Sequence, residues 1–149
     1  MLRAKDIMTR EVITVQLSTT VEELARLLTE HRISGAPVVN DRGDLIGIVT
    51  EHDLISRNKR LHIPTIMRLF DAYIMLESPG TIEKEINRMA ATAVRDIYTK
   101  EVLTVAEDTT VEEIATIMAE KRVYLLPVVE GASLRGIIGK IDVVKGMAK

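Results

Sequence analysis

The chain contains the same pattern of residues twice, and this repeat limits what it can fold into. When the sequence is aligned with itself at an offset of 90, residues 6–39 match residues 96–129, and 18 of the 34 aligned positions are identical. The match continues beyond this segment after one residue is dropped from the second copy, so that Asp53 aligns with Asp142. A repeat of this length indicates two copies of one structural unit, and each prediction for one copy applies to the other.

Each copy begins with a predicted strand and a predicted helix. The stretches 12–15 and 102–105 are short and rich in β-branched residues, which predicts strands. Thr20 and Thr110 are each followed three residues later by a glutamate, and this capping-box pattern predicts the start of a helix. The apolar residues that follow have the spacing of one buried helical face.

The second part of each copy predicts a hairpin and another helix. In the first copy, residues 37–39 and 45–49 are apolar and are separated by a polar turn that contains glycine. Asp53 and Asp142 then stand where the next helix begins. Each copy therefore has the predicted order strand, helix, strand, strand, helix.

This order predicts an α/β fold with a mixed sheet. A strand, a crossover helix and a second strand favour parallel pairing, while the following hairpin adds an antiparallel partner. A small sheet of short strands cannot stand alone in water, so we expect two pseudo-symmetric β-α-β-β-α repeats that pack face to face into one module. The predicted boundaries are 1–55 for the first repeat, 56–92 for a helical linker and 93–149 for the second repeat.

The linker has a sequence pattern of its own. Its apolar spacing predicts two short helices, over 65–76 and 81–91. A basic cluster precedes them, and it is either a solvated helix end or a contact for a polyphosphate. This cluster consists of Arg57, Lys59, Arg60 and His62.

The composition excludes several classes of protein. The formal net charge is -2, so there is no general positive field to hold a nucleic-acid backbone or an anionic membrane. The absence of cysteine excludes disulfides, thiolate catalysis and metal sites with cysteine ligands. The N-terminal residues lack the apolar region of a secretory signal, and no apolar run has the length of a membrane span. We therefore expect a soluble, cytoplasmic protein.

The sequence gives no sign of a catalytic centre. His31, His52 and His62 lack the spacing of metal-binding motifs. No glycine-rich phosphate loop and no nucleophile elbow is present. We predict that the protein is not an enzyme and has neither a metal site nor a catalytic cofactor.

The repeated strings DIMT, VITV, TTVEE, ISGAPVV and GIVTEHD resemble a tandem pair of CBS domains, the regulatory domains named after cystathionine β-synthase, which together form a Bateman module. The resemblance covers both copies and leaves residues 54–93 as the variable linker. It implies a compact disc with two clefts that bind an adenosine-containing ligand such as AMP, ADP, ATP, S-adenosylmethionine or NAD. It also implies that the partners include this small molecule, a second copy in a homodimer and an effector protein.

The segment from Thr50 to Asp53 supports this expectation on physical grounds. It stands where a strand gives way to a helix, and a carboxylate in that place can accept hydrogen bonds from the two hydroxyls of a ribose. Thr50 adds a hydroxyl on the same side. The alternative is that Asp53 only provides a favourable charge in the first turn of the helix.

The resemblance implies that each cleft combines the strand-to-helix segment of one copy with adenine-lining positions of the other. The favoured cleft would contain Ile48, Thr50, Asp53, Tyr98, Leu103, Val123 and Tyr124. The second, weaker cleft would contain Met8, Ile13, Ile33, Ser34, Ile137, Gly139 and Asp142.

The two predicted clefts differ in their side chains. In the second copy Gly139 stands where the first copy has Thr50, so the hydroxyl is missing there. Tyr98 and Tyr124 belong to the favoured cleft, and an aromatic side chain that stacks on a base contributes about 1–3 kcal/mol. The alternative is that both tyrosines fill core space. We predict that the favoured cleft is the occupied one.

Three functions remain at this point. The leading hypothesis is a ligand sensor whose change of conformation is passed to a partner protein. The alternative is a structural or dimerisation subunit with vestigial clefts, which binds through exposed apolar helix faces. Nucleic-acid binding through residues 57–68 is a third possibility, against which the negative net charge argues.

Overall fold

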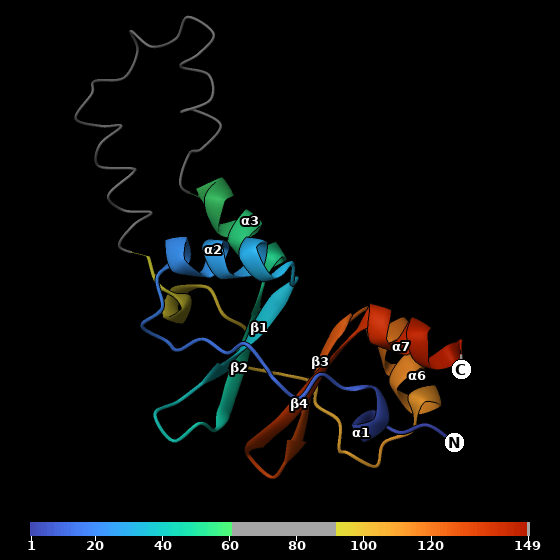
Figure 1. Cartoon of the computed structure of the whole chain (residues 1–149). Helices are drawn as coiled ribbons and strands as arrows, with labels where there is room; N and C mark the ends of the chain where they lie inside the picture. The colour runs from blue at the N-terminus through green and yellow to red at the C-terminus, as the bar shows by residue number, and fades with distance from the viewer. Residues whose placement is uncertain (61–91, 149) are drawn as a thin grey trace, which may run out of the picture.

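A computed structural model of the chain describes residues 1–60 and 92–148, arranged as two halves of similar architecture (Figure 1). The predicted linker helices over 65–76 and 81–91, and the side chains of the basic cluster from Arg57 to His62, lie outside the described residues. The described elements are, in chain order, α1 (Ala4–Ile7), α2 (Val21–His31), β1 (Gly35–Val39), β2 (Leu45–Thr50), α3 (Glu51–Arg60), the 3-10 helix η3 (Val94–Asp96), α6 (Val111–Lys121), β3 (Leu125–Glu130), β4 (Ser133–Gly139) and α7 (Lys140–Met147).

Helices α2 and α6 begin at the predicted capping boxes. The hydroxyl of Thr20 accepts a hydrogen bond from the Glu23 amide at 3.0 Å, and the Glu23 carboxylate accepts one from the Thr20 amide at 3.4 Å. Thr110 and Glu113 form the same pair at 3.2 and 3.3 Å. These bonds satisfy amides that the first turn leaves without helical partners, which confirms both predicted helix starts.

The predicted hairpins are also confirmed. Strands β1 and β2 pair antiparallel with Gly35 opposite Thr50, and β3 and β4 pair antiparallel with Leu125 opposite Gly139. Both hairpins have an irregularity after the fourth strand residue, and both turns contain a glycine in the left-handed region. The two copies therefore share element order and the place of the irregularity, while the second turn is shorter, because pairing continues to Glu130 and Ser133.

The strands predicted at 12–15 and 102–105 are wrong in length, because each is reduced to a single bridging residue. Val15 pairs in parallel with Val38, since its amide donates to the Pro37 carbonyl at 3.0 Å and its carbonyl accepts from the Val39 amide at 2.9 Å. Val105 makes the equivalent bridge with Val128. Within the predicted strand of the first half, the Val12 amide donates to the Arg10 carbonyl at 3.1 Å and so stays out of the ladder. The sheets are mixed as predicted, with a parallel partner one residue long.

The two halves exchange the segments that precede their first bridging residues. The amide and carbonyl of Thr9 bond with those of Ile137 in β4, at 2.9 and 3.0 Å, and Thr99 forms the equivalent pair with Ile48 in β2, at 2.8 and 2.9 Å. As a result α1 lies beside α6 and α7, and both chain ends lie at the second half (Figure 1). The repeat in the sequence does not reveal this exchange, because it does not show which half each segment contacts.

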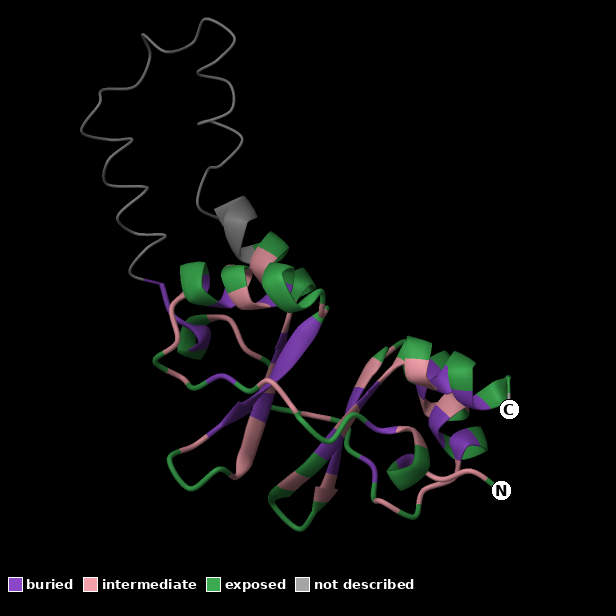
Figure 2. Cartoon of the chain, viewed as in Figure 1, coloured by how far each residue is buried: buried purple, intermediate pink, exposed green. Residues whose placement is uncertain are grey.

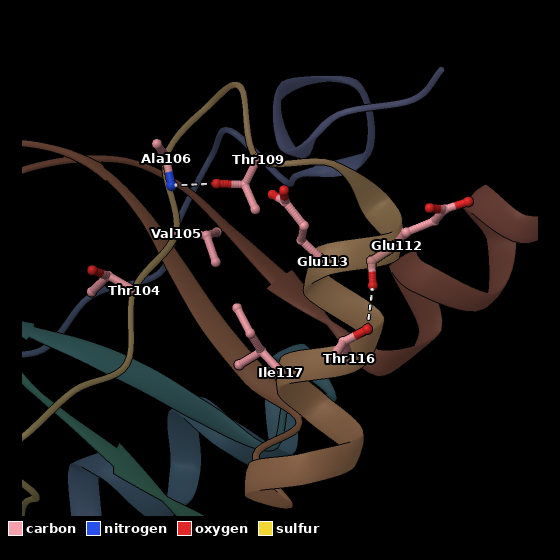
Figure 3. A pocket seen from close by; sticks show the side chains of 8 residues that line it. All are labelled: Thr104, Val105, Ala106, Thr109, Glu112, Glu113, Thr116 and Ile117. Atoms are coloured by element: carbon pink, nitrogen blue, oxygen red, sulfur yellow. Dashed lines mark hydrogen bonds between the residues drawn. The ribbon is translucent and has the colours of Figure 1, made fainter.

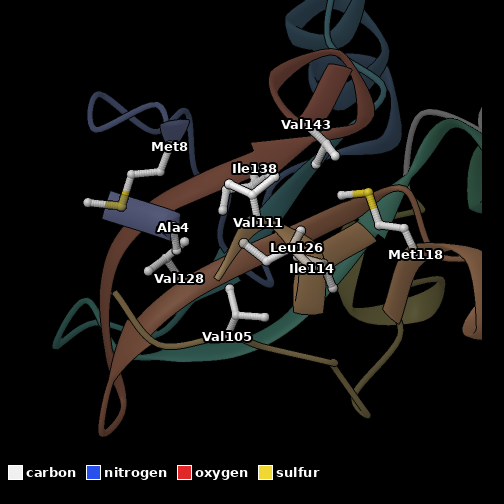
Figure 4. Close-up of a cluster of buried hydrophobic side chains, with 10 residues drawn as sticks. All are labelled: Ala4, Met8, Val105, Val111, Ile114, Met118, Leu126, Val128, Ile138 and Val143. Carbon is white, nitrogen blue, oxygen red and sulfur yellow. The ribbon is translucent and has the colours of Figure 1, made fainter. Parts of the chain in front are cut away.

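Each half has its own buried cluster, completed by the segment that the other half supplies. Ala4 and Met8 are buried with second-half residues, as Figure 4 shows, while Val94 is buried with first-half residues. In Figure 2 the buried positions follow the strands and the helix faces turned toward them. Neither half completes its core alone, and the two pseudo-symmetric repeats form one module, which confirms the predicted fold class.

Among the helices of the described ranges, none is long and apolar enough to cross a membrane. The cytoplasmic location expected from the sequence stays a prediction.

Candidate functional site

The end of β2 and the start of α3 bring Thr50 and Asp53 together. Oδ2 of Asp53 accepts hydrogen bonds from the Thr50 amide at 2.9 Å and from the Thr50 hydroxyl at 3.3 Å. Asp53 therefore caps its helix, as one interpretation of the sequence proposed. Among the described residues no hydrogen bond engages its other oxygen, Oδ1, and the side chain is half-buried. A half-buried carboxylate with one free oxygen can both cap the helix and accept from a ligand hydroxyl.

The equivalent junction in the second half has the cap without the hydroxyl. Oδ2 of Asp142 accepts a hydrogen bond from the Gly139 amide at 2.8 Å. The same amide-to-carboxylate bond is present in both halves, and the two junctions differ in their side chains. Gly139 has no side-chain hydroxyl, so the weaker binding predicted for this junction stays a prediction.

Tyr98 lies on the first half, against the middle of β2. A Cβ atom placed on Gly47 would lie 2.7 Å from Cε2 of Tyr98 and 2.7 Å from the Thr99 carbonyl oxygen, so only glycine fits beneath the ring. The half-buried tyrosine also packs against the cluster of the first half. Much of Tyr98 is therefore used for packing, and its neighbour Thr99 holds the predicted site residue Ile48 through two backbone hydrogen bonds.

Met8 takes the place of Tyr98 in the second half. A Cβ atom on Gly136 would lie 2.6 Å from the Met8 sulfur. Met8 is only 9% exposed and belongs to the cluster of the second half. The glycines beneath these two side chains, Gly47 and Gly136, were not among the predicted site residues, although they align in the repeat.

The start of β3 brings residues of the second half to the end of β2. A Cβ atom on Gly35 would lie 3.0 Å from Cδ2 of Leu125 and 3.0 Å from Cγ2 of Thr50, so these two side chains lie around one glycine. Tyr124 precedes Leu125, and its side chain is 51% exposed. The segment that carries Tyr124 therefore adjoins the end of β2, and the shared cleft of these residues stays a prediction.

The remaining predicted residues have more ordinary surroundings. Val123 and Ile33 pack against the clusters of the second and first halves. Leu103 is 41% exposed, and Ile13 is half-buried. Their roles in ligand binding stay predictions, as do those of Ser34, whose carbonyl accepts from the Glu51 amide, and of Ile137, which pairs with Thr9.

A hollow of about 580 Å³ lies elsewhere, between the segment that precedes α6 and the helix itself (Figure 3). It contains none of the predicted residues and is lined by Thr104, Val105, Ala106, Thr109, Glu112, Glu113, Thr116 and Ile117. Thr116 aligns with Arg26, whose guanidinium in the first half lies 3.4 Å from the Glu22 carboxylate. The hollow therefore stands where a short side chain replaces a long one. Its two carboxylates, those of Glu112 and Glu113, disfavour an anionic phosphate.

Among the residues that the structure describes, no group of three or more acidic, histidine or cysteine side chains is arranged to hold a metal ion. At the candidate site the Thr50 hydroxyl and the Asp53 carboxylate suit hydrogen bonds to a ligand.

Known proteins with similar sequences and structures support the same arrangement. The uncharacterized protein MJ1426 of Methanocaldococcus jannaschii is 28% identical, over 96% of this chain and 89% of the relative. An inosine-5'-monophosphate dehydrogenase of Korarchaeum cryptofilum is 34% identical over 95% of this chain, which spans only 23% of that enzyme. The crystal structure of CBSX2 from Arabidopsis thaliana in complex with AMP is similar with a TM-score of 0.74 and 26% identity, over 99% of this chain and 97% of that chain.

The family comparison covers most of both halves. The sequence profile of the CBS domain matches residues 4–59 and again residues 94–149, in agreement with the repeat found in the sequence. The chain therefore belongs to the CBS domain family and carries a tandem pair of these domains.

Proposed function

We propose that this protein is a regulatory module that binds an adenosine-containing ligand between its two halves and signals the binding to a partner protein. The observation that supports the proposal is the meeting of Thr50 and Leu125 around Gly35, which brings the segment that carries Tyr124 to the end of β2. The AMP complex of CBSX2, a protein of the same family, supports this class of ligand. The candidate ligands are AMP, ADP, ATP, S-adenosylmethionine and NAD.

Each part of such a ligand has a chemically suited neighbour in the favoured cleft. The free oxygen of Asp53 accepts from the ribose hydroxyls, because a carboxylate is an acceptor with two oxygens. The exposed ring of Tyr124 offers a stacking surface for adenine. Ile48 and Tyr98, fixed by the bonds to Thr99 and by Gly47, form an apolar wall. The second cleft lacks the threonine hydroxyl and binds more weakly.

Signalling follows from the fact that both halves contribute to one site. A ligand held by both halves favours the arrangements in which their junctions are close, and so it shifts the population of conformations. A partner protein that binds these arrangements more tightly then binds the ligand-loaded chain more tightly. The gain in its binding free energy equals the gain that the partner gives to ligand binding. We assign no catalytic step to this chain.

Thermal unfolding with each candidate ligand tests the proposal. A ligand present at about 100 times its dissociation constant adds about 2.7 kcal/mol to the stability of the folded state, which raises the midpoint by several degrees. Ribose 5-phosphate and GMP are matched controls that lack the adenine base. The proposal is contradicted if AMP, ADP, ATP, S-adenosylmethionine and NAD all leave the midpoint unchanged.

A second candidate function, that of a dimerisation subunit, is favoured by one face of α7. Ile141, Val144 and Met147 recur every third residue and are 59%, 59% and 63% exposed. Three large apolar side chains along one helix form a surface that a second copy could cover. We propose a homodimer that uses this face.

Sedimentation equilibrium tests the homodimer. The chain is expected to be dimeric at micromolar concentration, and Ile141→Glu is expected to make it monomeric, because it places a charge in the covered surface. Ala119→Glu, at an exposed position of α6, is the matched control and should leave the dimer intact. A monomeric parent chain would contradict the homodimer, and the ligand-binding proposal would remain.

A further inference from the structure

The two halves differ in charge and shape at one pair of matching positions. Residues 34 and 51 of the first half align with residues 124 and 140 of the second. In the first half these are Ser34 and Glu51, joined by a backbone hydrogen bond of 2.8 Å. In the second half Nζ of Lys140 lies 5.4 Å from the centre of the Tyr124 ring. A small polar residue beside an anion is thus replaced by an aromatic ring beside a cation.

Lys140 is available for another partner. Its side chain is exposed, and among the described residues it forms no ion pair. Its ammonium group makes a cation–π contact with the face of Tyr124, and this tyrosine is half exposed to solvent. A cation over an exposed ring is held weakly, so an anionic group can replace the ring as the partner of the ammonium.

Lys140 stands beside the ring on which the adenine of the proposed ligand would stack. An adenine stacked on Tyr124 would take the face that the ammonium covers, and the displaced ammonium would stay beside the same ring. Asp53 would hold the ribose from the first half, so the group attached to the ribose would lie between the two junctions. A phosphate there would meet a cation, whereas a positively charged sulfonium would meet a like charge.

We infer that Lys140 makes this cleft select adenosine ligands that carry phosphate. The inference rests on the proposed function, because it places the adenine on Tyr124. It narrows the ligand class to adenine nucleotides and disfavours S-adenosylmethionine. Glu51, at the matching position of the first half, provides no such selection.

Isothermal titration calorimetry of the full chain with AMP, adenosine and S-adenosylmethionine tests the inference. The parent chain should bind AMP at least about tenfold more tightly than adenosine, since the bond between a cation and a phosphate is charge-assisted. Lys140→Gln should weaken AMP binding by about tenfold and change adenosine binding by less than about twofold. Lys140→Arg should retain the preference for AMP, and Glu51→Gln, the matched control, should not reduce it.

The outcomes separate the inference from the proposed function. An unchanged ratio of AMP to adenosine affinity in Lys140→Gln overturns the inference and leaves the adenosine site in place. Equal losses for AMP and adenosine in this variant also overturn it, because the lysine would then not act on the phosphate. Binding of S-adenosylmethionine without binding of AMP overturns the inference and leaves the proposed function. Failure of the parent chain to bind AMP, adenosine and S-adenosylmethionine, with no shift of the unfolding midpoint by ADP, ATP or NAD, overturns the proposed function, and the inference with it.

Discussion

The first and second halves of this protein share their order of elements and differ in several side chains, above all at the junction of hairpin and second helix. Both have a helix that starts at a threonine–glutamate capping box, a hairpin with its irregularity at the same place and a second helix capped by an aspartate. Where β2 meets α3 the residues are Thr50 and Glu51, but where β4 meets α7 they are Gly139 and Lys140. The capping bonds and the hairpin pairing thus recur in both halves, while the side chains at the exposed junction differ.

The largest expected effect concerns the exchange of segments between the halves. Leu24 and Ile114 occupy matching positions, and both are fully buried. Leu24→Ala and Ile114→Ala should each lower the free energy of unfolding by about 3 kcal/mol, measured by urea denaturation. Because each core includes a segment of the other half, each variant should also speed amide exchange in the half that was not changed.

Mass spectrometry of hydrogen exchange resolves the two halves. Glu30→Ala, at an exposed helix position, is the control and should leave exchange unchanged in both halves. If Leu24→Ala speeds amide hydrogen exchange only within the first half, the halves unfold independently. The segments that each half contributes to the other's core would then not couple them.

A smaller difference is expected at the two glycines beneath Tyr98 and Met8. Gly47→Ala brings a methyl group against an aromatic ring and the Thr99 carbonyl, and should cost about 2 kcal/mol of unfolding free energy. Gly136→Ala meets mainly the flexible side chain of Met8 and should cost about 1 kcal/mol. Urea denaturation of both variants measures the difference. An equal or reversed order would show that Met8 is held as rigidly as the tyrosine.

The ligand site gives the next prediction. Asp53→Ala and Asp142→Ala remove the same type of helix cap, so each should lower stability by about 1 kcal/mol. Only Asp53→Ala should weaken AMP binding, by about tenfold or 1.4 kcal/mol, since the favoured cleft uses this carboxylate. Calorimetry and urea denaturation on the same pair of variants separate the two effects. A larger loss of binding in Asp142→Ala would move the ligand to the second cleft.

The sequence predicts the features of this fold that depend on neighbouring residues. The capping boxes at Thr20 and Thr110 and the hairpin turns arise from local hydrogen bonds, so residue type and spacing are enough to find them. The strand predicted over 12–15 is too long because the Val12 amide bonds locally to the Arg10 carbonyl and only Val15 pairs with Val38, a local choice that β-branched spacing does not reveal.

Contacts between distant segments are harder to predict. The exchanged segments depend on how the two copies meet, which is a tertiary property. At the candidate site, the sequence indicates Thr50 and Asp53 as a pair, but it does not show that one carboxylate oxygen caps the helix. The contact of Lys140 with Tyr124 joins two ends of a hairpin and becomes visible only once the register of β3 and β4 is known.

The smallest expected effect concerns the hollow on α6, where Thr116 stands in place of Arg26. Thr116→Arg should allow an ion pair with Glu112 four residues earlier, like the pair of Arg26 with Glu22, and should change stability by less than about 0.5 kcal/mol. The arginine side chain would cover part of the hollow. AMP affinity should stay within about twofold, because the proposed site lies at Thr50 and not on α6.

The reciprocal change, Arg26→Thr, should be equally mild, since it removes an exposed ion pair and shortens the matching side chain of the first half. Calorimetry with AMP on the two variants therefore decides between two places for the ligand. A strong loss of binding in Thr116→Arg alone would place AMP in the hollow and make the difference between the junctions irrelevant to binding. Unchanged AMP binding in both variants would mean that the hollow only reflects the shorter side chain of Thr116. The difference that matters for binding would then lie at the junctions of Thr50 and Gly139.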